Sequence, residues 1–402
     1  MPRALVLLPT TSYRAADFVD GAAALGVDLA IASEETPPID MGDRFVLIDC
    51  GDTDASVAAI VALATSTPVD AVVAVDDVGV EIAVRAAERL GLPHSDVTGV
   101  DATLNKLSMR DRLRKAEVHQ PEHAPIRHSD EVDVALDQVG YPAVIKPISM
   151  SASRGVIRVD TLQQAEAAVA RIRGILADSG HELDEPLIVE RFVPGPEVAV
   201  EAMAWGDHLE ILAIFDKPDP MDGPYFEETI YVTPSRRTDT TEIEHLVGRA
   251  ASALGITHGP VHAEVRIEDG TPTLVEIAAR SIGGLCGRSL RFGLMGSTLE
   301  MMILRQALAM EKPGLRRERT AAGVLMVPIP RSGVLLGFEG VAETQAIPGI
   351  TGFEQTIPTG ELVRALPEGD RYLGFVFARS ETPEAVETAL RAARDTLVPL
   401  IR

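Results

Sequence analysis

Short apolar runs alternate with segments of helical apolar spacing through the first 95 residues of the chain. This pattern predicts strands at residues 4–8, 28–32, 45–48 and 71–75, and helices at residues 15–25, 54–64 and 78–90. Strands separated by helices pair in parallel, because each helix carries the chain back to the start of the next strand. The segment after the first strand, residues 9–13, contains no glycine and so lacks the loop of a dinucleotide site. The sequence therefore predicts a Rossmann-like α/β domain over residues 1–95.

The pattern becomes less regular after residue 95. Residues 96–312 combine a helix at 104–116 with strands that do not alternate strictly with helices, which is typical of α+β construction. Residues 313–402 are dense in glycine and proline and end in an amphipathic helix at about 383–397. We therefore predict a second domain over residues 96–312 and a small C-terminal α+β domain over residues 313–402.

The charge balance limits the partners of the chain. Its 402 residues include 37 lysines and arginines against 60 aspartates and glutamates, a net charge of −23. Such a charge repels phosphate-rich surfaces, which argues against nucleic acid or an anionic membrane as the main partner. No apolar run reaches the roughly 18–20 residues of a membrane helix. The two cysteines, Cys50 and Cys286, are too few for a disulfide scaffold. We expect a cytoplasmic protein.

A predicted strand delivers a lysine next to a loop of small residues. Apolar residues 143–145 precede Lys146, and residues 149–155 include three serines and one glycine. In such a loop, backbone N–H groups and hydroxyls can reach phosphate oxygens while the ammonium supplies positive charge. The alternative is an ordinary strand end followed by a turn. On this pattern alone both interpretations stay open.

Two glutamates lie in neighbouring apolar strands. Glu264 and Glu276 flank a turn at residues 268–270, so a hairpin would direct both carboxylates into one cleft. Buried carboxylates are costly unless they are paired or bind a metal, and two carboxylates with nucleotide phosphates form the usual Mg²⁺ site. Arg280 follows four residues later and can bind a phosphoryl or carboxylate group. The alternative is a pair of exposed hairpin charges.

A third pattern is a strand that runs into a proline-containing linker. Residues 190–193 are followed by Pro194, Gly195 and Pro196, and then by Glu197. The backbone of an extended linker can bind the edge of an adenine ring, and a carboxylate can bind ribose hydroxyls. An ordinary linker would have the same appearance.

Taken in this order, the three patterns resemble the ATP-grasp superfamily, and the resemblance covers most of the chain. Within it the chain looks like an ADP-forming carboxylate–amine ligase of the L-amino-acid ligase type, with more distant similarity to biotin carboxylase. The resemblance implies an N-terminal Rossmann-like domain, a two-part ATP-binding domain and a small C-terminal domain. It also implies ATP and Mg²⁺, which Mn²⁺ can replace.

The resemblance assigns roles to particular residues. Those expected to bind ATP are Lys106, Lys146, Ser151, Ser153, Gly155, Glu190, Phe192, Val193 and Glu197. The metal ligands are expected to be Glu264 and Glu276, and the catalytic residues Arg280, Lys146 and Glu276. Many relatives have asparagine two residues after the second glutamate, whereas this chain has Ala278, whose side chain cannot bind a metal.

Candidate substrate residues are less specific. They are His262, Lys217, Glu228, Gly283 and Gly284. His262 shares a strand face with Glu264, and glycines after Arg280 permit close approach of a substrate. A hairpin histidine bound within the protein and a solvated loop around Lys217 are the alternatives.

These residues predict an enzyme that forms an amide or peptide bond through an acyl phosphate and releases ADP and phosphate. Its substrates would be a small carboxylate, expected to be an amino acid, and an amine. One rival is a carboxylase that acts on bicarbonate, and another is an ATP-binding sensor without catalysis. We expect a homodimer, the commonest assembly of soluble oligomers.

Overall fold

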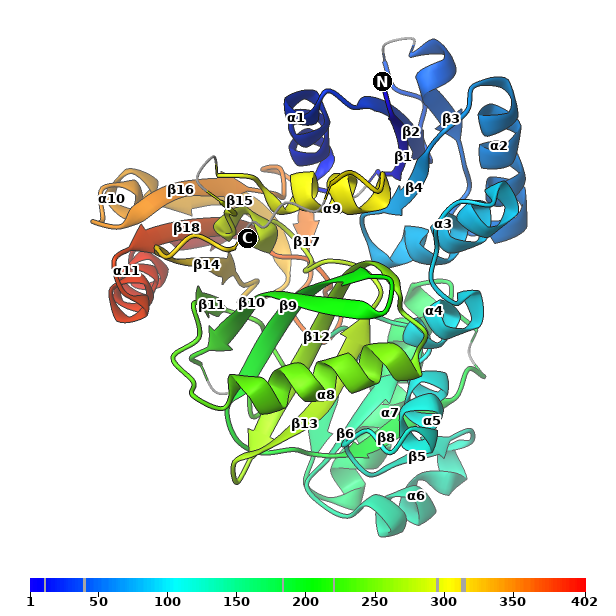
Figure 1. Cartoon of the computed structure of the whole chain (residues 1–402). Helices are drawn as coiled ribbons and strands as arrows, with labels where there is room; N and C mark the ends of the chain where they lie inside the picture. The colour runs from blue at the N-terminus through cyan, green and yellow to red at the C-terminus, as the bar shows by residue number, and fades with distance from the viewer. Residues whose placement is uncertain (11, 39–40, 183, 220, 294–295, 312–315) are drawn as a thin grey trace.

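The computed structural model describes the chain except residues 11, 39–40, 183, 220, 294–295 and 312–315. In Figure 1 the N-terminal sheet lies above a large central sheet, and a smaller sheet lies below it on the right. The C-terminal strands extend the central sheet to the left.

The N-terminal part is a four-stranded parallel sheet of order β3-β2-β1-β4, as the sequence predicts. Every predicted element lies within two residues of its observed bounds. The strands are β1 (Arg3–Leu7), β2 (Asp28–Ser33), β3 (Phe45–Leu47) and β4 (Ala71–Ala74), and the helices are α1 (Ala15–Leu25), α2 (Thr53–Ser66) and α3 (Asp77–Leu90). Helix α3 ends where Gly91 adopts a left-handed conformation and its N–H binds two carbonyls of the last turn.

The helix predicted at residues 104–116 is present, and a further helix that was not predicted precedes it. They are α4 (Val97–Thr103) and α5 (Lys106–Lys115). Helix α5 begins two residues later than predicted, because the Asn105 side chain accepts a hydrogen bond from the backbone N–H of Ser108 and so caps the helix. Lys106 is therefore the first residue of a helix.

A small antiparallel sheet of order β5-β8-β6-β7 follows. Its strands are β5 (His123–Ile126), β6 (Ala143–Pro147), β7 (Ile157–Val159) and β8 (Leu187–Arg191), and its helices are α6 (Val132–Val139) and α7 (Leu162–Asp178). The apolar faces of both helices pack on the sheet in one core, because each presents buried residues at helical spacing.

The central sheet has eight antiparallel strands in the order β13-β12-β9-β10-β11-β14-β18-β16. Its strands are β9 (Glu197–Trp205), β10 (His208–Lys217), β11 (Ile230–Thr233), β12 (His258–Glu268), β13 (Thr271–Ala278), β14 (Ala321–Val327), β16 (Ile350–Gln355) and β18 (Gly374–Ser380). Strands from both sides of residue 313 pair directly, since β11 pairs with β14. The predicted boundary between residues 312 and 313 itself lies outside the described residues.

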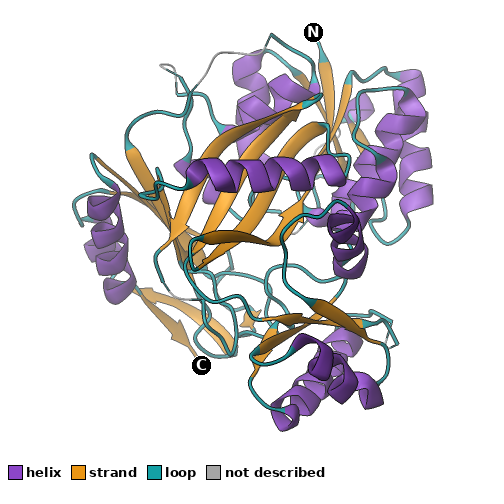
Figure 2. Cartoon of the chain, turned by 60° about the horizontal axis from the view of Figure 1, so that its bottom comes forward, coloured by secondary structure: helices purple, strands orange, loops and turns teal. Residues whose placement is uncertain are grey.

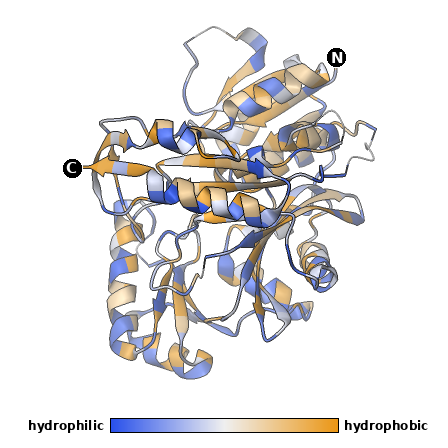
Figure 3. Cartoon of the chain, turned by 90° about the vertical axis from the view of Figure 1, so that its left-hand side faces the viewer, coloured by the Kyte–Doolittle hydropathy of each residue, from blue (hydrophilic) through white to orange (hydrophobic). Residues whose placement is uncertain are grey.

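Three further strands and four α-helices lie in the described part of the chain, besides three short 3-10 helices at Gly42–Arg44, Ser129–Glu131 and Cys286–Ser289. The strands are β15 (Gly333–Glu339), β17 (Leu362–Val363) and β19 (Val398–Ile401), and the α-helices are α8 (Thr240–Ala253), α9 (Leu299–Ala307), α10 (Val341–Gln345) and α11 (Pro383–Thr396). Figure 3 shows hydrophobic and hydrophilic residues alternating along the surface helices. No helix of the described residues is long and apolar enough to cross a membrane.

The two faces of the central sheet differ. Helix α8 lies across one face (Figures 1 and 2), where Val198 and Val200 of β9 pack in the same core as Ile243 and Val247 of the helix. Side chains alternate along a strand, so Glu197 and other odd-numbered residues of β9 lie on the opposite face. That second face carries the polar residues considered next.

Candidate active site

Two adjoining cavities lie at the second face of the central sheet. The smaller has a volume of about 80 Å³ and the larger about 360 Å³. The residues that line both are Ser151, Ser153, Glu228, Glu264 and Glu276. A group that passes from a molecule in one cavity to a molecule in the other must therefore pass these side chains.

Lys146 lines the smaller cavity from strand β6 and is held by an ion pair. Its Nζ donates to Oε2 of Glu190 at 2.7 Å, and Nε of Arg110 donates to the other oxygen at 2.7 Å. Burial alone would raise the pKa of Glu190, but Arg110 and Lys146 outweigh burial and hold the pKa well below its ordinary value. The predicted contact of Glu190 with the nucleotide would therefore use a carboxylate that two cations already bind.

Lys106 holds the loop of residues 149–155, which we call the lid loop. Its Nζ donates to the carbonyl of Met150 in that loop. Lys106, Ser151 and Ser153 all line the smaller cavity, so the structure brings these predicted nucleotide-binding residues together with Lys146. An ammonium and two hydroxyls side by side form a suitable surface for phosphate oxygens.

The far end of the lid loop is attached to the C-terminal part of the chain. The N–H of Gly155 donates to the carbonyl of Pro367 at 2.9 Å, and Nε of Arg154 donates to the carbonyl of Glu368 at 3.0 Å. The expectation for Gly155 was that its backbone binds phosphate. In this structure its N–H is engaged elsewhere, and Gly155 lines neither cavity.

The linker between β8 and β9 forms another wall of the smaller cavity. Phe192, Val193 and Glu197 all line it, as predicted. Arg266 binds this linker: its Nε donates to Glu197 at 2.7 Å and its Nη1 donates to the carbonyl of Val193 at 2.6 Å. The Arg158 guanidinium lies 4.3 Å from the centre of the Phe192 ring. Two arginines thus hold the linker in place, and a nucleotide base could bind against it.

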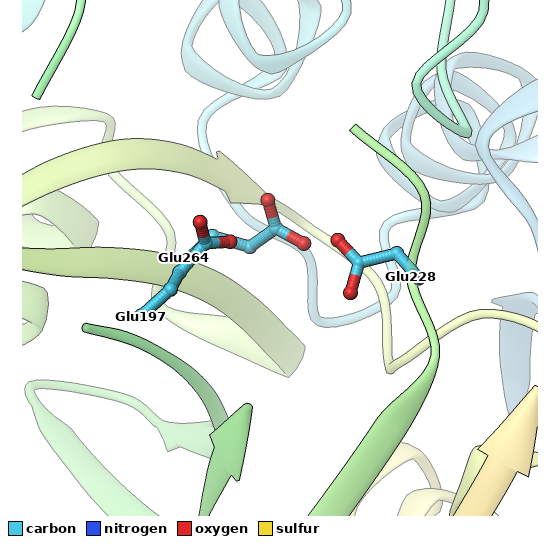
Figure 4. Close-up of side chains that lie close together, drawn as sticks. All are labelled: Glu197, Glu228 and Glu264. Carbon is cyan, nitrogen blue, oxygen red and sulfur yellow. The ribbon is translucent and has the colours of Figure 1, made fainter. Parts of the chain in front are cut away.

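Three carboxylates converge on one ammonium. Nζ of Lys217 lies 2.6 Å from Glu197, 2.9 Å from Glu228 and 3.1 Å from Glu264. Figure 4 shows the three carboxylates pointing toward one another. The pKa of Glu228 rises to about 7 because of burial and the neighbouring carboxylates, although Lys217 opposes the rise. Lys217 lines neither cavity and holds the three carboxylates together, and the substrate contact expected of it stays a prediction.

Glu264 and Glu276 face each other in the register of β12 and β13. The sequence predicts this arrangement, and both side chains line both cavities. Burial alone would raise the pKa of Glu264, but Lys217 and His262 outweigh burial and lower it. Paired carboxylate oxygens at the meeting point of two cavities are the donor set that Mg²⁺ prefers, so these residues fit that ion. Ala278 lines the larger cavity and supplies no ligand atom.

His262 lies beside this pair, on the same face of β12. Its Nδ1 lies 2.7 Å from Glu201, which is fully buried, and its Nε2 lies 3.9 Å from Glu264. Burial would lower the pKa of His262, but Glu201 and Glu264 outweigh burial and raise the pKa to about 9. His262 lines the larger cavity, which agrees with its predicted place near substrate.

Arg280 lies in the larger cavity and is held from the N-terminal part. Its Nε donates to Asp77 at 2.7 Å, at the first residue of helix α3. Burial alone would raise the pKa of Asp77, but Arg280 outweighs it and lowers the pKa. Gly283 and Gly284, both predicted near substrate, also line the larger cavity. The roles assigned to these residues stay predictions.

With this geometry described, the sequence can be compared with known protein families. The ATP-grasp domain matches residues 139–289, the ATP-grasp N-terminal domain matches residues 19–94, and the L-amino acid ligase C-terminal domain 2 matches residues 325–400. The chain contains an ATP-grasp domain. The architecture predicted from the sequence is thereby confirmed.

Known structures agree with the ATP-grasp assignment. The L-amino acid ligase from Bacillus licheniformis superposes with a TM-score of 0.83 over 100% of this chain and 99% of that one, at 24% identity. Biotin carboxylase from Campylobacter jejuni gives a TM-score of 0.69 at 13% identity over 99% and 92% of the two chains. At these identities the likeness establishes the fold.

The alanine–anticapsin ligase of Bacillus subtilis is a curated relative. It is 28% identical over 244 residues, which are 56% of this chain and 51% of that ligase. The ATP-grasp chain therefore spans about half the length of this relative.

Sequence reasoning missed several residues that hold the ATP-grasp site together. Arg110 lies one helical turn after Lys106, and Arg266 lies two residues after Glu264 on the same strand face, so periodicity pointed to both. Asp77 follows β4, at the carboxyl ends of the parallel strands, where ligands commonly bind. Tyr13 and Tyr372, which line the larger cavity, have no comparable signal in the sequence.

Proposed function

We propose that the chain is an ATP-dependent carboxylate–amine ligase that forms an amide or peptide bond and releases ADP and phosphate. The observation that carries this proposal is the shared wall of the two cavities, which contains Glu264 and Glu276. A phosphoryl group bound there would lie within reach of molecules in both cavities. The likeness to amide-forming ligases of the same fold supports the proposal.

In this proposal the nucleotide occupies the smaller cavity. Its base lies against the linker at Phe192 and Val193, and its phosphates lie beside Lys106 and Lys146. The Ser151 and Ser153 hydroxyls of the lid loop bind phosphate oxygens and exclude water, which would otherwise hydrolyse an activated acid. Because Glu190 and Arg110 position the Lys146 ammonium before ATP binds, little reorganisation is needed.

Glu264 and Glu276 would hold the magnesium ion. A bound divalent cation neutralises negative charge on the phosphate oxygens. Lys146 and Arg280 supply positive charge from the protein itself.

The chemistry then follows from positioning. An oxygen of the substrate carboxylate attacks the γ-phosphorus, and the bond to the bridging oxygen breaks, so that ADP leaves with the electron pair. The amine attacks the acyl carbon of the acyl phosphate, phosphate leaves, and the amine nitrogen loses a proton. Arg280, fixed by Asp77, stabilises the negative charge of the acyl phosphate oxygens.

The first test is ATP turnover with pooled amino acids and small carboxylic acids, with hydroxylamine as the amine. ADP together with a hydroxamate is the expected result and identifies the acid. Release of AMP would overturn the mechanism. Turnover that depends on bicarbonate, without hydroxamate, would favour the carboxylase.

A further inference from the structure

The larger cavity has a wall of three aromatic rings, which we call the aromatic wall: Tyr13, Tyr372 and Phe375. The Phe375 ring lies 6.3 Å from the Tyr13 ring and 6.0 Å from the Tyr372 ring, both in edge-on contacts. Phe375 is fully buried, and the two tyrosines pack against the same core. Such contacts hold rings in fixed orientations.

The aromatic wall continues into an apolar floor. Ile282, Met326 and Cys286 line the same cavity and are almost completely buried. These residues come from the segment after β13 and from β14, so the floor is the core of the central sheet seen from the cavity. A cavity bounded in this way binds apolar groups favourably, at roughly 25 cal/mol for each Å² removed from water.

Three charged residues near the aromatic wall have partners within the protein. Arg14 binds Glu300 at 2.6 Å and is 2% exposed. Arg371 binds Glu361 at 2.9 Å, and Asp370 lies 3.4 Å from Arg154. A charged substrate side chain placed beside them would compete with these partners.

Close packing at Gly284 keeps the aromatic wall in position. A Cβ built on Gly284 would lie 2.5 Å from Cζ of Phe375, so no larger residue fits while the ring keeps its place. Gly283, next to it, has no atom within 4 Å of a built Cβ and leaves space at the cavity.

We infer that the larger cavity selects, as the acid to be activated, an amino acid with a bulky apolar or aromatic side chain. This inference rests on the proposed function. The side chain lies against the aromatic wall and the apolar floor. The carboxylate lies at Arg280 and the shared wall with Glu264 and Glu276, where the phosphoryl group arrives. Tyr13 and Tyr372 determine this specificity.

The test compares phenylalanine, leucine and methionine with alanine, aspartate and lysine as acids, with hydroxylamine as the amine. We expect kcat/KM for at least one bulky apolar acid to exceed that for alanine by tenfold or more, the order of magnitude of added methylene groups in an apolar pocket. In Tyr372→Ala we expect this preference, the ratio of kcat/KM for the apolar acid to kcat/KM for alanine, to fall about tenfold. Leu336→Ala, an exposed apolar residue on β15, is the control and leaves both values unchanged.

A binding measurement separates this inference from the proposed function. Calorimetry of L-phenylalanine and L-alanine with the whole chain in MgADP needs no turnover. Tyr372-dependent phenylalanine binding without any hydroxamate would overturn the ligase and support the apolar pocket. Hydroxamate formation from alanine, aspartate or lysine in preference to the apolar acids would overturn the pocket and support the ligase. An apolar preference found only for the amine would overturn the assignment to the acid.

Discussion

The two cavities share a wall but differ in what holds their other walls together. The smaller one is bounded by charged groups that bind each other, such as Lys146 with Glu190 and Arg266 with Glu197. The larger one is bounded on one side by aromatic rings from distant parts of the chain, Tyr13 and Phe375. Paired charges suit a fixed anionic ligand, whereas an apolar surface suits a side chain that varies between substrates. Under the proposed function, the first cavity would set the reaction and the second would set its substrate.

The largest effect is expected at the shared wall. Glu276→Gln should lower kcat by roughly 10²-fold or more, because a neutral amide cannot hold the cation that we propose the carboxylate pair binds. The Mg²⁺ concentration needed for half-maximal rate should rise as well. Glu210→Gln, on β10 and away from both cavities, is the control. Near-normal turnover of Glu276→Gln would remove Glu276 from the metal assignment.

A smaller loss of activity is expected from a substitution in the smaller cavity. In Lys146→Arg the planar guanidinium replaces a compact ammonium beside Glu190, so we expect KM for ATP to rise by about tenfold or more. Steady-state kinetics at varied ATP measures this, with Lys115→Arg at the end of α5 as the control. Unchanged ATP affinity and rate would argue against phosphate binding by Lys146.

A moderate effect should arise where the N-terminal sheet meets the site. Asp77→Asn frees Arg280, so KM for the acid should rise about tenfold, the scale of one charge-assisted hydrogen bond, while KM for ATP stays constant. Asp54→Asn, in the first turn of α2, is the control. If KM for ATP changed and KM for the acid did not, Asp77 would act on nucleotide binding instead.

The same variant tests the pH dependence of stability. The pKa of Asp77 in the folded chain is below its ordinary value because Arg280 outweighs burial. The ion pair therefore stabilises the fold at neutral pH, and this contribution is lost as the pH falls from the unfolded-state pKa through the lowered folded-state pKa. Urea unfolding of the wild type and Asp77→Asn should differ at pH 7 and converge in acid; a constant difference would contradict the pairing.

The smallest effect on rate is expected at the aromatic wall. Gly284→Ala introduces a Cβ against Phe375 and a left-handed non-glycine residue, so the free energy of unfolding should fall by about 1–3 kcal/mol. Turnover of bulky acids should decline more than that of alanine. Gly174→Ala in α7, where a Cβ meets no atom within 4 Å, should not destabilise the chain. Equal thermal stability of the two variants would show that Phe375 can move.

Regions held by interactions between residues close in the sequence could be predicted better than regions held by interactions between distant residues. The N-terminal strands and helices could be predicted closely because apolar periodicity and terminal glycines such as Gly91 are local signals. The facing of Glu264 and Glu276 was also predictable, since a short turn fixes the pairing of their strands. Helix α5 was also predicted within two residues, and its exact start was not, because it depends on one capping side chain, Asn105.

The partners of these side chains could not be predicted in the same way. Asp77 lies 203 positions before Arg280, and only the packing of two sheets brings them together. The contact of Gly155 with Pro367 is of the same kind. The aromatic wall has no sequence signal either, because its rings meet only after β1 and β18 are in place.

The central sheet has a consequence for protein engineering. Because β11 pairs with β14, and β14 with β18, main-chain hydrogen bonds join the residues after 320 to the rest of the central sheet. Removing residues after 320 would leave the edge of β11 unpaired. It would also expose the apolar residues of β11 that α11 covers, and an exposed strand edge promotes aggregation. Chimeras between relatives therefore need crossover points in the surface loops that connect strands of the sheet. Strands that pair with each other should come from the same parent protein.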